Sequence, residues 1–266
     1  MLDIILNIDG ANDDSFLLRS AMELARREHA FLTGLQIVAI YPSLLGVPDA
    51  SMLLDAEEQD ALARRPWWLD LCSKAGTAGE WEVIRGLYVA SLAKRSQLAD
   101  FVISTLSTEA HAVIAGVGEL TRVLFADGAP MLLVPDAWQK PLQTRRVMIA
   151  WNGSGEAARA IKAALPLLMH AAEVHVLDGE LDGLPGISPP SPPIRAWLRR
   201  HGIQAHWHPF DGGHDAGRIL QAEATAMQAD LLVMGAWGRS RMSELVLGGA
   251  TRWLLDHALQ PLFLAH

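Results

Sequence analysis

The stretch "VMIAWNGSGEAARAIKAALPLL" (residues 147–168) decides the fold, because a similar stretch, "IILNIDGANDDSFLLRSAMELA" (residues 4–25), stands near the start of the chain. Each stretch begins with an apolar, strand-like run, passes through an Asn-Gly or Asp-Gly step, and continues with the period of a helix. In the later copy, apolar residues recur on one helical face: Ala157, Ile161, Ala164, Leu165 and Leu168. A repeated strand–turn–helix unit indicates that the chain contains two copies of one fold.

The ends of the two halves repeat as well. "PMLLVP" (residues 130–135) resembles "PLFLAH" (residues 261–266), and the polar stretch "DAWQKPLQTRR" between the halves is typical of a linker. We therefore predict two domains, 1–137 and 144–266. We expect their last strands to pair across a pseudo-twofold axis, so that the halves form an intrachain pseudo-dimer; further homodimerisation is left open.

The second half alternates between strand and helix patterns. The expected strands cover residues 147–151, 173–177, 205–209, 231–234 and 262–265, and the expected helices cover 156–170, 193–201, 216–227 and 250–259. Strands as short and apolar as "LLVM" are typical of a buried parallel sheet. We predict an α/β protein with two tandem Rossmann-like domains. Each has a five-stranded, mostly parallel sheet with helices on both faces. Ligands of such sheets bind beyond the carboxyl ends of the strands.

Composition limits the possible partners. A net charge of -8 argues against a nucleic-acid binder, and no apolar run approaches the ~18 residues that cross a membrane. The single cysteine, Cys72, fits a reducing compartment, and the N-terminus lacks the basic region of a signal peptide. We expect a cytoplasmic protein without nucleic-acid or membrane partners. Trp67 and Trp68 are expected to pack against the sheet of the first domain rather than to form a partner surface.

Glycines mark the end of one strand and the start of the next helix in "VMGAWGRSRMSELVLGGATRWLL" (residues 233–255). They are Gly235, Gly238, Gly248 and Gly249. Without a Cβ, such residues allow positive φ and let a ligand approach the backbone, and free N–H groups at a helix start bind phosphate. Arg239 would add positive charge and the Thr251 hydroxyl a hydrogen bond. The plainer interpretation, a tight strand–loop–helix connection without a ligand, fits the spacing equally well.

This spacing resembles the G-x2-G-x9-G pattern, followed by Ser or Thr, of nucleotide-binding universal stress proteins. The resemblance covers the entire second half, and the first half is similar in layout, so the chain resembles a tandem two-domain member. It implies bound ATP (or ADP or AMP), with or without Mg²⁺. It further implies contacts to the nucleoside from Ala150, Asn152 and Val176. Ribose and phosphates would be surrounded by Gly235, Gly238, Gly248, Gly249, Ala250 and Thr251.

Two residues depart from that pattern. Asn152 stands where many members have Asp and supplies no negative charge for a metal, and Gly249 replaces the small hydroxyl residue but keeps its backbone N–H. In the first half, the Gly-x2-Gly step after the strand at 100–105 is missing. Asp127-Gly128 takes the place of the second glycine pair and adds negative charge. We expect one nucleotide per chain, in the second half.

Three functions remain open. The leading hypothesis is a nucleotide-dependent regulator of an unknown protein partner, and the others are a nucleotide-free adaptor and a slow ATPase. Against catalysis, only Glu244 offers a general base near the predicted phosphates, and no nucleophile elbow occurs. His206 and His208 should face the same side of a strand. We expect them to be solvated edge residues rather than metal ligands, because a strong zinc pattern needs four ligands.

Overall fold

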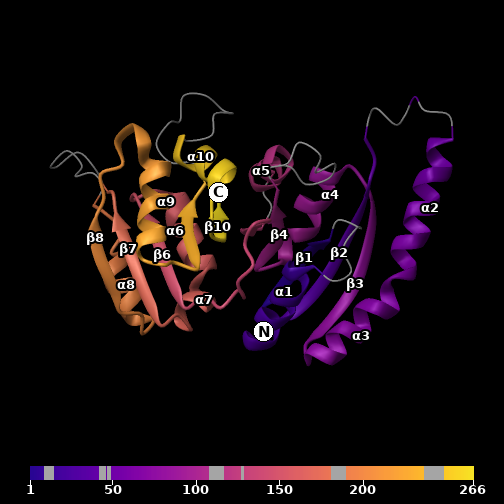
Figure 1. The fold of residues 1–266 in the computed structure, drawn as a ribbon, viewed down its shortest axis with the longest axis horizontal. Coiled ribbons are helices and arrows are strands. Elements are labelled where there is room, and N and C mark those ends of the chain that lie inside the picture. Colours follow the sequence, from indigo (N-terminus) through magenta and orange to yellow (C-terminus); the bar gives the residue numbers. More distant parts are fainter. Residues whose placement is uncertain are drawn as a thin grey trace. The chain divides into compact units, whose positions relative to one another are not determined.

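A computed structural model describes residues 1–8, 15–41, 46, 49–107, 117–126, 129–180, 190–236 and 249–266, with the side chains of residues 117 and 214 excepted. The chain divides into two compact units, Met1–Leu142 (the first unit) and Gln143–His266 (the second unit) (Figure 1).

The first unit is a parallel sheet with the strand order β3-β2-β1-β4-β5. Its strands are β1 (Asp3–Ile8), β2 (Phe31–Ala39), β3 (Ala78–Gly86), β4 (Phe101–Leu106) and β5 (Met131–Pro135). The α-helices in its described part are α1 (Phe16–Arg27), α2 (Ala50–Ala63), α3 (Arg65–Ala75), α4 (Tyr88–Arg95) and α5 (Val117–Phe125).

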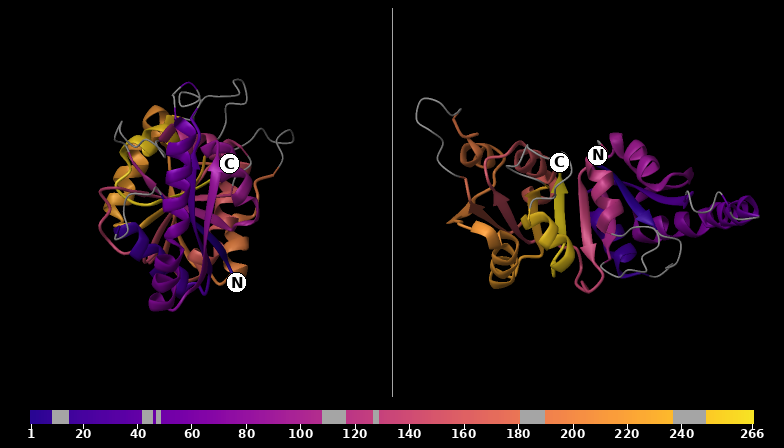
Figure 2. Two further views of the ribbon diagram at one scale, coloured as in Figure 1. Left: turned by 90° about the vertical axis from the view of Figure 1, so that its right-hand side faces the viewer. Right: turned by 90° about the horizontal axis from the view of Figure 1, so that it is seen from above.

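The second unit repeats this topology with the order β10-β9-β6-β7-β8, again with parallel neighbours. Its strands are β6 (Arg146–Trp151), β7 (Glu173–Asp178), β8 (Ala205–Pro209), β9 (Leu231–Gly235) and β10 (Leu262–Ala265). Its described α-helices are α6 (Gly155–Ala163), α7 (Leu165–Met169), α8 (Ile194–Arg200), α9 (Ala216–Ala226) and α10 (Gly249–His257). Helices cover both faces of each sheet (Figure 2). The predicted fold class is confirmed.

Burial explains the apolar strands. In the second unit, β9 and β10 are buried along almost their whole length, because helices on both faces exclude water from both sides of the sheet. One predicted helix, 156–170, is instead divided into α6 and α7. Pro166 lies in the first turn of α7, where it has no N–H to donate to the carbonyl of Lys162. The predicted N-cap is confirmed: Ser154 Oγ accepts the N–H of Ala157 at 3.2 Å.

In each unit, an aspartate carboxylate accepts backbone N–H groups at the start of the central strand. In the first unit, Asp100 accepts the N–H of Asp3 at 2.7 Å. In the second, the two carboxylate oxygens of Asp230 accept the N–H groups of Arg145 and Arg146 at 3.0 and 3.1 Å. Both aspartates follow alanine just before a buried strand, in "ADFV" and "ADLL". The repeat in sequence is therefore also a repeat of hydrogen bonds.

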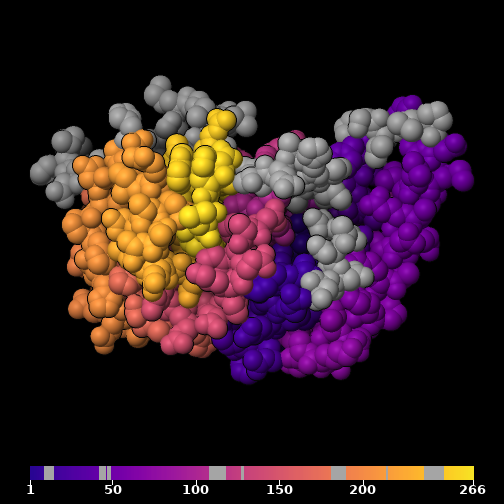
Figure 3. All heavy atoms as spheres, viewed as in Figure 1, coloured from indigo at the N-terminus to yellow at the C-terminus, as the bar shows by residue number. Residues whose placement is uncertain are grey.

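Helices α2 and α3 form a continuous ridge on the surface of the first unit (Figure 3). Beneath it, Trp68 is completely buried, and its ring occupies the space that a Cβ on Gly34 of β2 would need. Trp67 and Trp81 pack beside it in tilted and edge-to-face arrangements, with ring centroids 5.7–6.1 Å apart within this trio. The expected packing of Trp68 against the sheet is confirmed.

Candidate functional site

A cavity of about 390 Å³ opens at the carboxyl ends of β6, β7 and β9 in the second unit. Ala150, Leu177 and Met234 come from these three strands. The remaining lining comes from the last residues of β6 and β9, the residue after β7, the β6–α6 turn, the segment between β8 and α9, α9 itself, and the first turn of α10. These residues are Trp151, Asn152, Gly179, Phe210, Asp211, Gly212, Gly213, Ala216, Leu220, Gly235, Gly249, Ala250 and Thr251. Cavities of this size accommodate small organic ligands.

The cavity brings together most of the predicted site residues that the structure describes. Those that line it are Ala150, Asn152, Gly235, Gly249, Ala250 and Thr251. Val176 is not among the lining residues; it is completely buried, and its neighbour Leu177 lines the cavity instead. Successive residues of a strand point to opposite sides of the sheet, so the side chains of Val176 and Leu177 face opposite ways. Gly238, Arg239 and Gly248 lie outside the described residues, as does Glu244.

The turn after β6 is organised by side chains. Asn152 Oδ1 accepts the N–H of Ser154 at 3.1 Å, which fixes the start of α6. Gly153 has φ +74°, and a Cβ there would collide with the carboxylate of Glu180. That carboxylate is held by the Trp151 indole, whose Nε1–H donates to Glu180 Oε2 at 2.8 Å. The Asn-Gly step is therefore a rigid turn at the edge of the cavity.

Two glycines of the predicted phosphate loop have different roles. Gly235 does not adopt the positive φ that a glycine allows. A Cβ on Gly235 would instead lie 2.4 Å from the backbone nitrogen of Ala157, so the glycine lets the first turn of α6 pack against the end of β9. Among the described residues, a Cβ on Gly249 would meet no heavy atom within 4 Å. Gly249 leaves open space at the start of α10.

One wall of the cavity, the segment that follows β8, was not predicted from the sequence. Phe210 continues the pairing of β8 with β7 through its N–H, which donates to the carbonyl of Asp178 at 2.9 Å. Its ring lies against Gly179, where a Cβ would be 3.1 Å from Phe210 Cδ1. A signal was present, because "PFDGGHDAG" (residues 209–217) places glycines between a strand and a helix, as the stretch at 248–249 does.

The described lining of the cavity contains few charged side chains. Among the described lining residues, Asp211 carries the single carboxylate, and none is Lys or Arg. Thr251 is buried in the first turn of α10, whose N–H groups carry the partial positive charge of a helix start.

Within the described ranges, no three side chains are placed to share a metal ion. No described helix has both the length and the apolar character of a membrane span.

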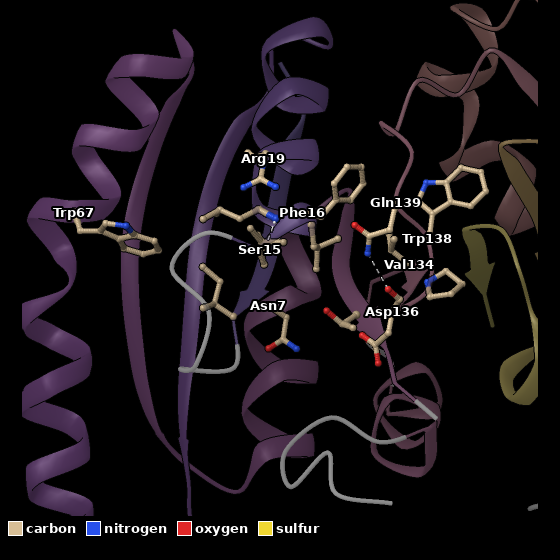
Figure 4. Close-up of a pocket in the computed structure, with 15 residues that line it drawn as sticks. Asn7, Ser15, Phe16, Arg19, Trp67, Val134, Asp136, Trp138 and Gln139 are labelled. Carbon is tan, nitrogen blue, oxygen red and sulfur yellow. Dashed lines mark hydrogen bonds between the residues drawn. The ribbon is translucent and has the colours of Figure 1, made fainter. Parts of the chain in front are cut away.

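The first unit has a different hollow, of about 430 Å³ (Figure 4). It lies where β1 and β5 end and α1 begins, and Ser15 caps that helix by accepting the N–H of Leu18 at 3.1 Å. Asn7 at its edge donates to Tyr88 and Ser104 at 2.8 and 3.0 Å. None of its described lining residues is a glycine, in contrast to the second unit. Asp127 and Gly128 lie outside the described residues.

No protein-family model and no curated protein matches this sequence. Solved structures do match along its full length. A universal stress protein from Archaeoglobus fulgidus DSM 4304 superposes with a TM-score of 0.73 at 16% identity, covering 99% of this chain and 95% of that one. The chain has the universal stress protein fold, present in two copies.

Two structures from Pseudomonas aeruginosa share the universal stress protein fold of this chain. A putative universal stress protein from strain UCBPP-PA14 and a functionally unknown protein from strain PAO1 each give a TM-score of 0.62. Their identities to this chain are 15% and 14%, and each match covers 99% of this chain and 92% of the other. At such identities the likeness concerns the fold.

Proposed function

We propose that the chain is a tandem universal stress protein whose second unit binds one adenine nucleotide, ATP or its products, and thereby regulates its association with a protein partner. The observation that carries the proposal is the convergence of Ala150, Asn152, Gly235 and the 249–251 turn on one cavity. These positions lie far apart in sequence, and each matches the position that the glycine pattern implies for a nucleotide contact.

The lining suits the parts of a nucleotide. Leu177 and Phe210 offer an apolar and an aromatic surface for a base. The N–H groups at Gly249 and Ala250 would meet phosphate oxygens at the start of α10, where the helix dipole favours negative charge. Mg²⁺ would take most of its ligands from phosphate and water, with Asp211 as the nearby carboxylate. Asn152 would contribute no charge, and its Oδ1 already accepts a hydrogen bond.

A regulatory role is favoured over catalysis by the character of the lining. Among the described lining residues, Asp211 has the single carboxylate that could act as a general base, and it is exposed. A general base that activates water needs a fixed position against the phosphate, which an exposed loop carboxylate does not supply. The protein partner and the effect of occupancy on it are part of the proposal.

Two substitutions of Gly249 test the nucleotide site. Both should fold, because a Cβ at this position meets no heavy atom of the described part of the chain within 4 Å. Gly249→Ser adds a hydroxyl and should tighten ATP binding by ~0.5–1.5 kcal/mol through one hydrogen bond. Gly249→Leu places its side chain in the cavity and should abolish ATP binding at an unchanged melting temperature. Titration calorimetry measures affinity and stoichiometry together, and we expect one site per chain.

The same titrations separate the alternatives. A folded wild-type chain that binds no ATP, and retains no nucleotide in native mass spectrometry, would support the nucleotide-free adaptor. ATP affinity unchanged in Gly249→Leu would place the nucleotide elsewhere. Two equivalent sites per chain would contradict the restriction to the second unit. Phosphate released during the titration, and absent from Gly249→Leu, would support a slow ATPase.

A further inference from the structure

Three histidines gather on the sheet of the second unit. His175 lies on β7, and His206 and His208 lie on β8, the edge strand. The ring of His175 stacks on both others, with centroids 5.1 Å and 5.3 Å apart and planes inclined by 27°. His175 Nδ1 and His208 Nε2 are 3.1 Å apart and share a hydrogen bond. The prediction that His206 and His208 face the same side is confirmed.

The histidine cluster (His175, His206 and His208) lies beside the cavity of the second unit. In the sheet register His208 is the partner of Leu177, which lines the cavity. His175 precedes Leu177 by two positions and therefore faces the same side of the sheet. Both strands continue into the cavity wall, where the N–H of Phe210 joins β8 to β7 at Asp178. Movement of β8 at the cluster would therefore move Phe210.

The hydrogen bond between the two rings depends on protonation. One ring must donate while the other accepts, so the bond is lost when both rings are protonated. Burial lowers the pKa of His175, the carboxylate of Glu173 raises it in opposition, and the two neighbouring histidines lower it further. Glu173 Oε2 lies 3.7 Å from His175 Nε2 and equally far from Arg146 Nε on β6. In the described part of the second unit, these are the charged groups that the contacts place around His175.

We propose that the histidine cluster makes the nucleotide site of the second unit sensitive to acid. Protonation of a second imidazole breaks the bond between His175 and His208 and places like charges on adjacent strands. An edge strand is paired on one side only, so β8 separates from β7 at this point. Phe210 then leaves the cavity wall, and the nucleotide binds more weakly. This inference rests on the nucleotide binding proposed above.

The size of the effect follows from proton linkage. Two conformations are compared, one in which β8 is paired with β7 and one in which it has separated. Each extra proton that the separated conformation binds changes the equilibrium constant between them by at most tenfold per pH unit. Acidification from about pH 7.5 to about pH 5.5 spans the range in which histidine titrates. We expect ATP affinity to fall by roughly 3- to 10-fold more in the wild type than in a chain whose His208 is replaced by a residue that cannot be protonated.

The test uses one pair of variants and one control. His208→Gln keeps a hydrogen-bonding group beside His175 but cannot be protonated, and His206→Gln removes one charge while leaving the bond intact. His170→Gln removes an exposed histidine outside the cluster. ATP affinity is measured for each chain at both pH values, and titration of the ATP phosphates cancels in the comparison. Hydrogen exchange of residues 203–213 is measured without nucleotide at the same pH values.

Wild type and His170→Gln should lose both affinity and exchange protection in acid, while His208→Gln should retain both, with His206→Gln between them. The same acid loss in His208→Gln as in wild type would overturn the inference while leaving the nucleotide site in place. If no chain binds ATP at either pH, the proposed function fails. The exchange data still decide whether the cluster controls the strand edge.

Discussion

Replacing Gly235 by alanine should break the contact between β9 and α6. The added Cβ would lie 2.4 Å from the nitrogen of Ala157 and 2.7–2.8 Å from two atoms of Glu156. Two of these three atoms belong to the backbone, so no side-chain rotation relieves the overlap. The first turn of α6 must move away, and the hydrogen bond from Ala157 to the Ser154 cap is stretched or lost.

Two costs add to give the expected magnitude. Overpacking a fixed core typically costs 1–3 kcal/mol, and loss of an N-cap costs about 1 kcal/mol. We therefore expect Gly235→Ala to lower the free energy of unfolding by about 2–4 kcal/mol. Urea denaturation followed by circular dichroism measures it. Gly249→Ala is the matched control, because its Cβ meets nothing within 4 Å, and its effect should stay within ~1 kcal/mol.

The result that would refute this reasoning is a Gly235→Ala chain as stable as the Gly249→Ala control. If its ATP affinity were lost at the same time, Gly235 would serve the ligand and not the packing of α6. Equal losses of stability in both variants would instead indicate a general cost of replacing glycine. A packing role for Gly235 requires a larger loss of stability in Gly235→Ala than in Gly249→Ala.

Further predictions concern titrating groups. Asp230→Asn should lower the free energy of unfolding by ~1.5–3 kcal/mol in urea, because an amide replaces a charged acceptor of two N–H groups; exposed Asp211→Asn is the control. Because burial lowers the pKa of His175, the unfolded chain binds protons more readily, and stability should fall as pH drops below 6.5; a flat profile would contradict this. Burial raises the pKa of Cys72 to about 11, so its alkylation near pH 8 should be slow until urea unfolds the chain.

The repeat, the α/β class and most element positions could be predicted from the amino-acid sequence. These depend on local features that can be read along the chain. Strand β9 follows from the apolar run Leu231–Met234, and the start of α6 follows from Ser154 three residues before Ala157. A similar stretch at residues 4–25 then implied that the first unit has the same layout. Backbone geometry and hydrophobic period act over a few residues, so they need no knowledge of the fold.

Only the tertiary structure decided which distant residues meet. Leu177 lines the cavity, whereas its neighbour Val176 does not. The register between β7 and β8 places the ring of His175 against that of His206, some thirty positions later in the chain. The close approach of α6 gave Gly235 a packing role that its spacing from other glycines did not reveal. Phe210 joined the site because β8 lies beside β7. Each outcome depends on sheet register and helix packing, which arise from contacts between residues far apart in the chain and leave no local pattern.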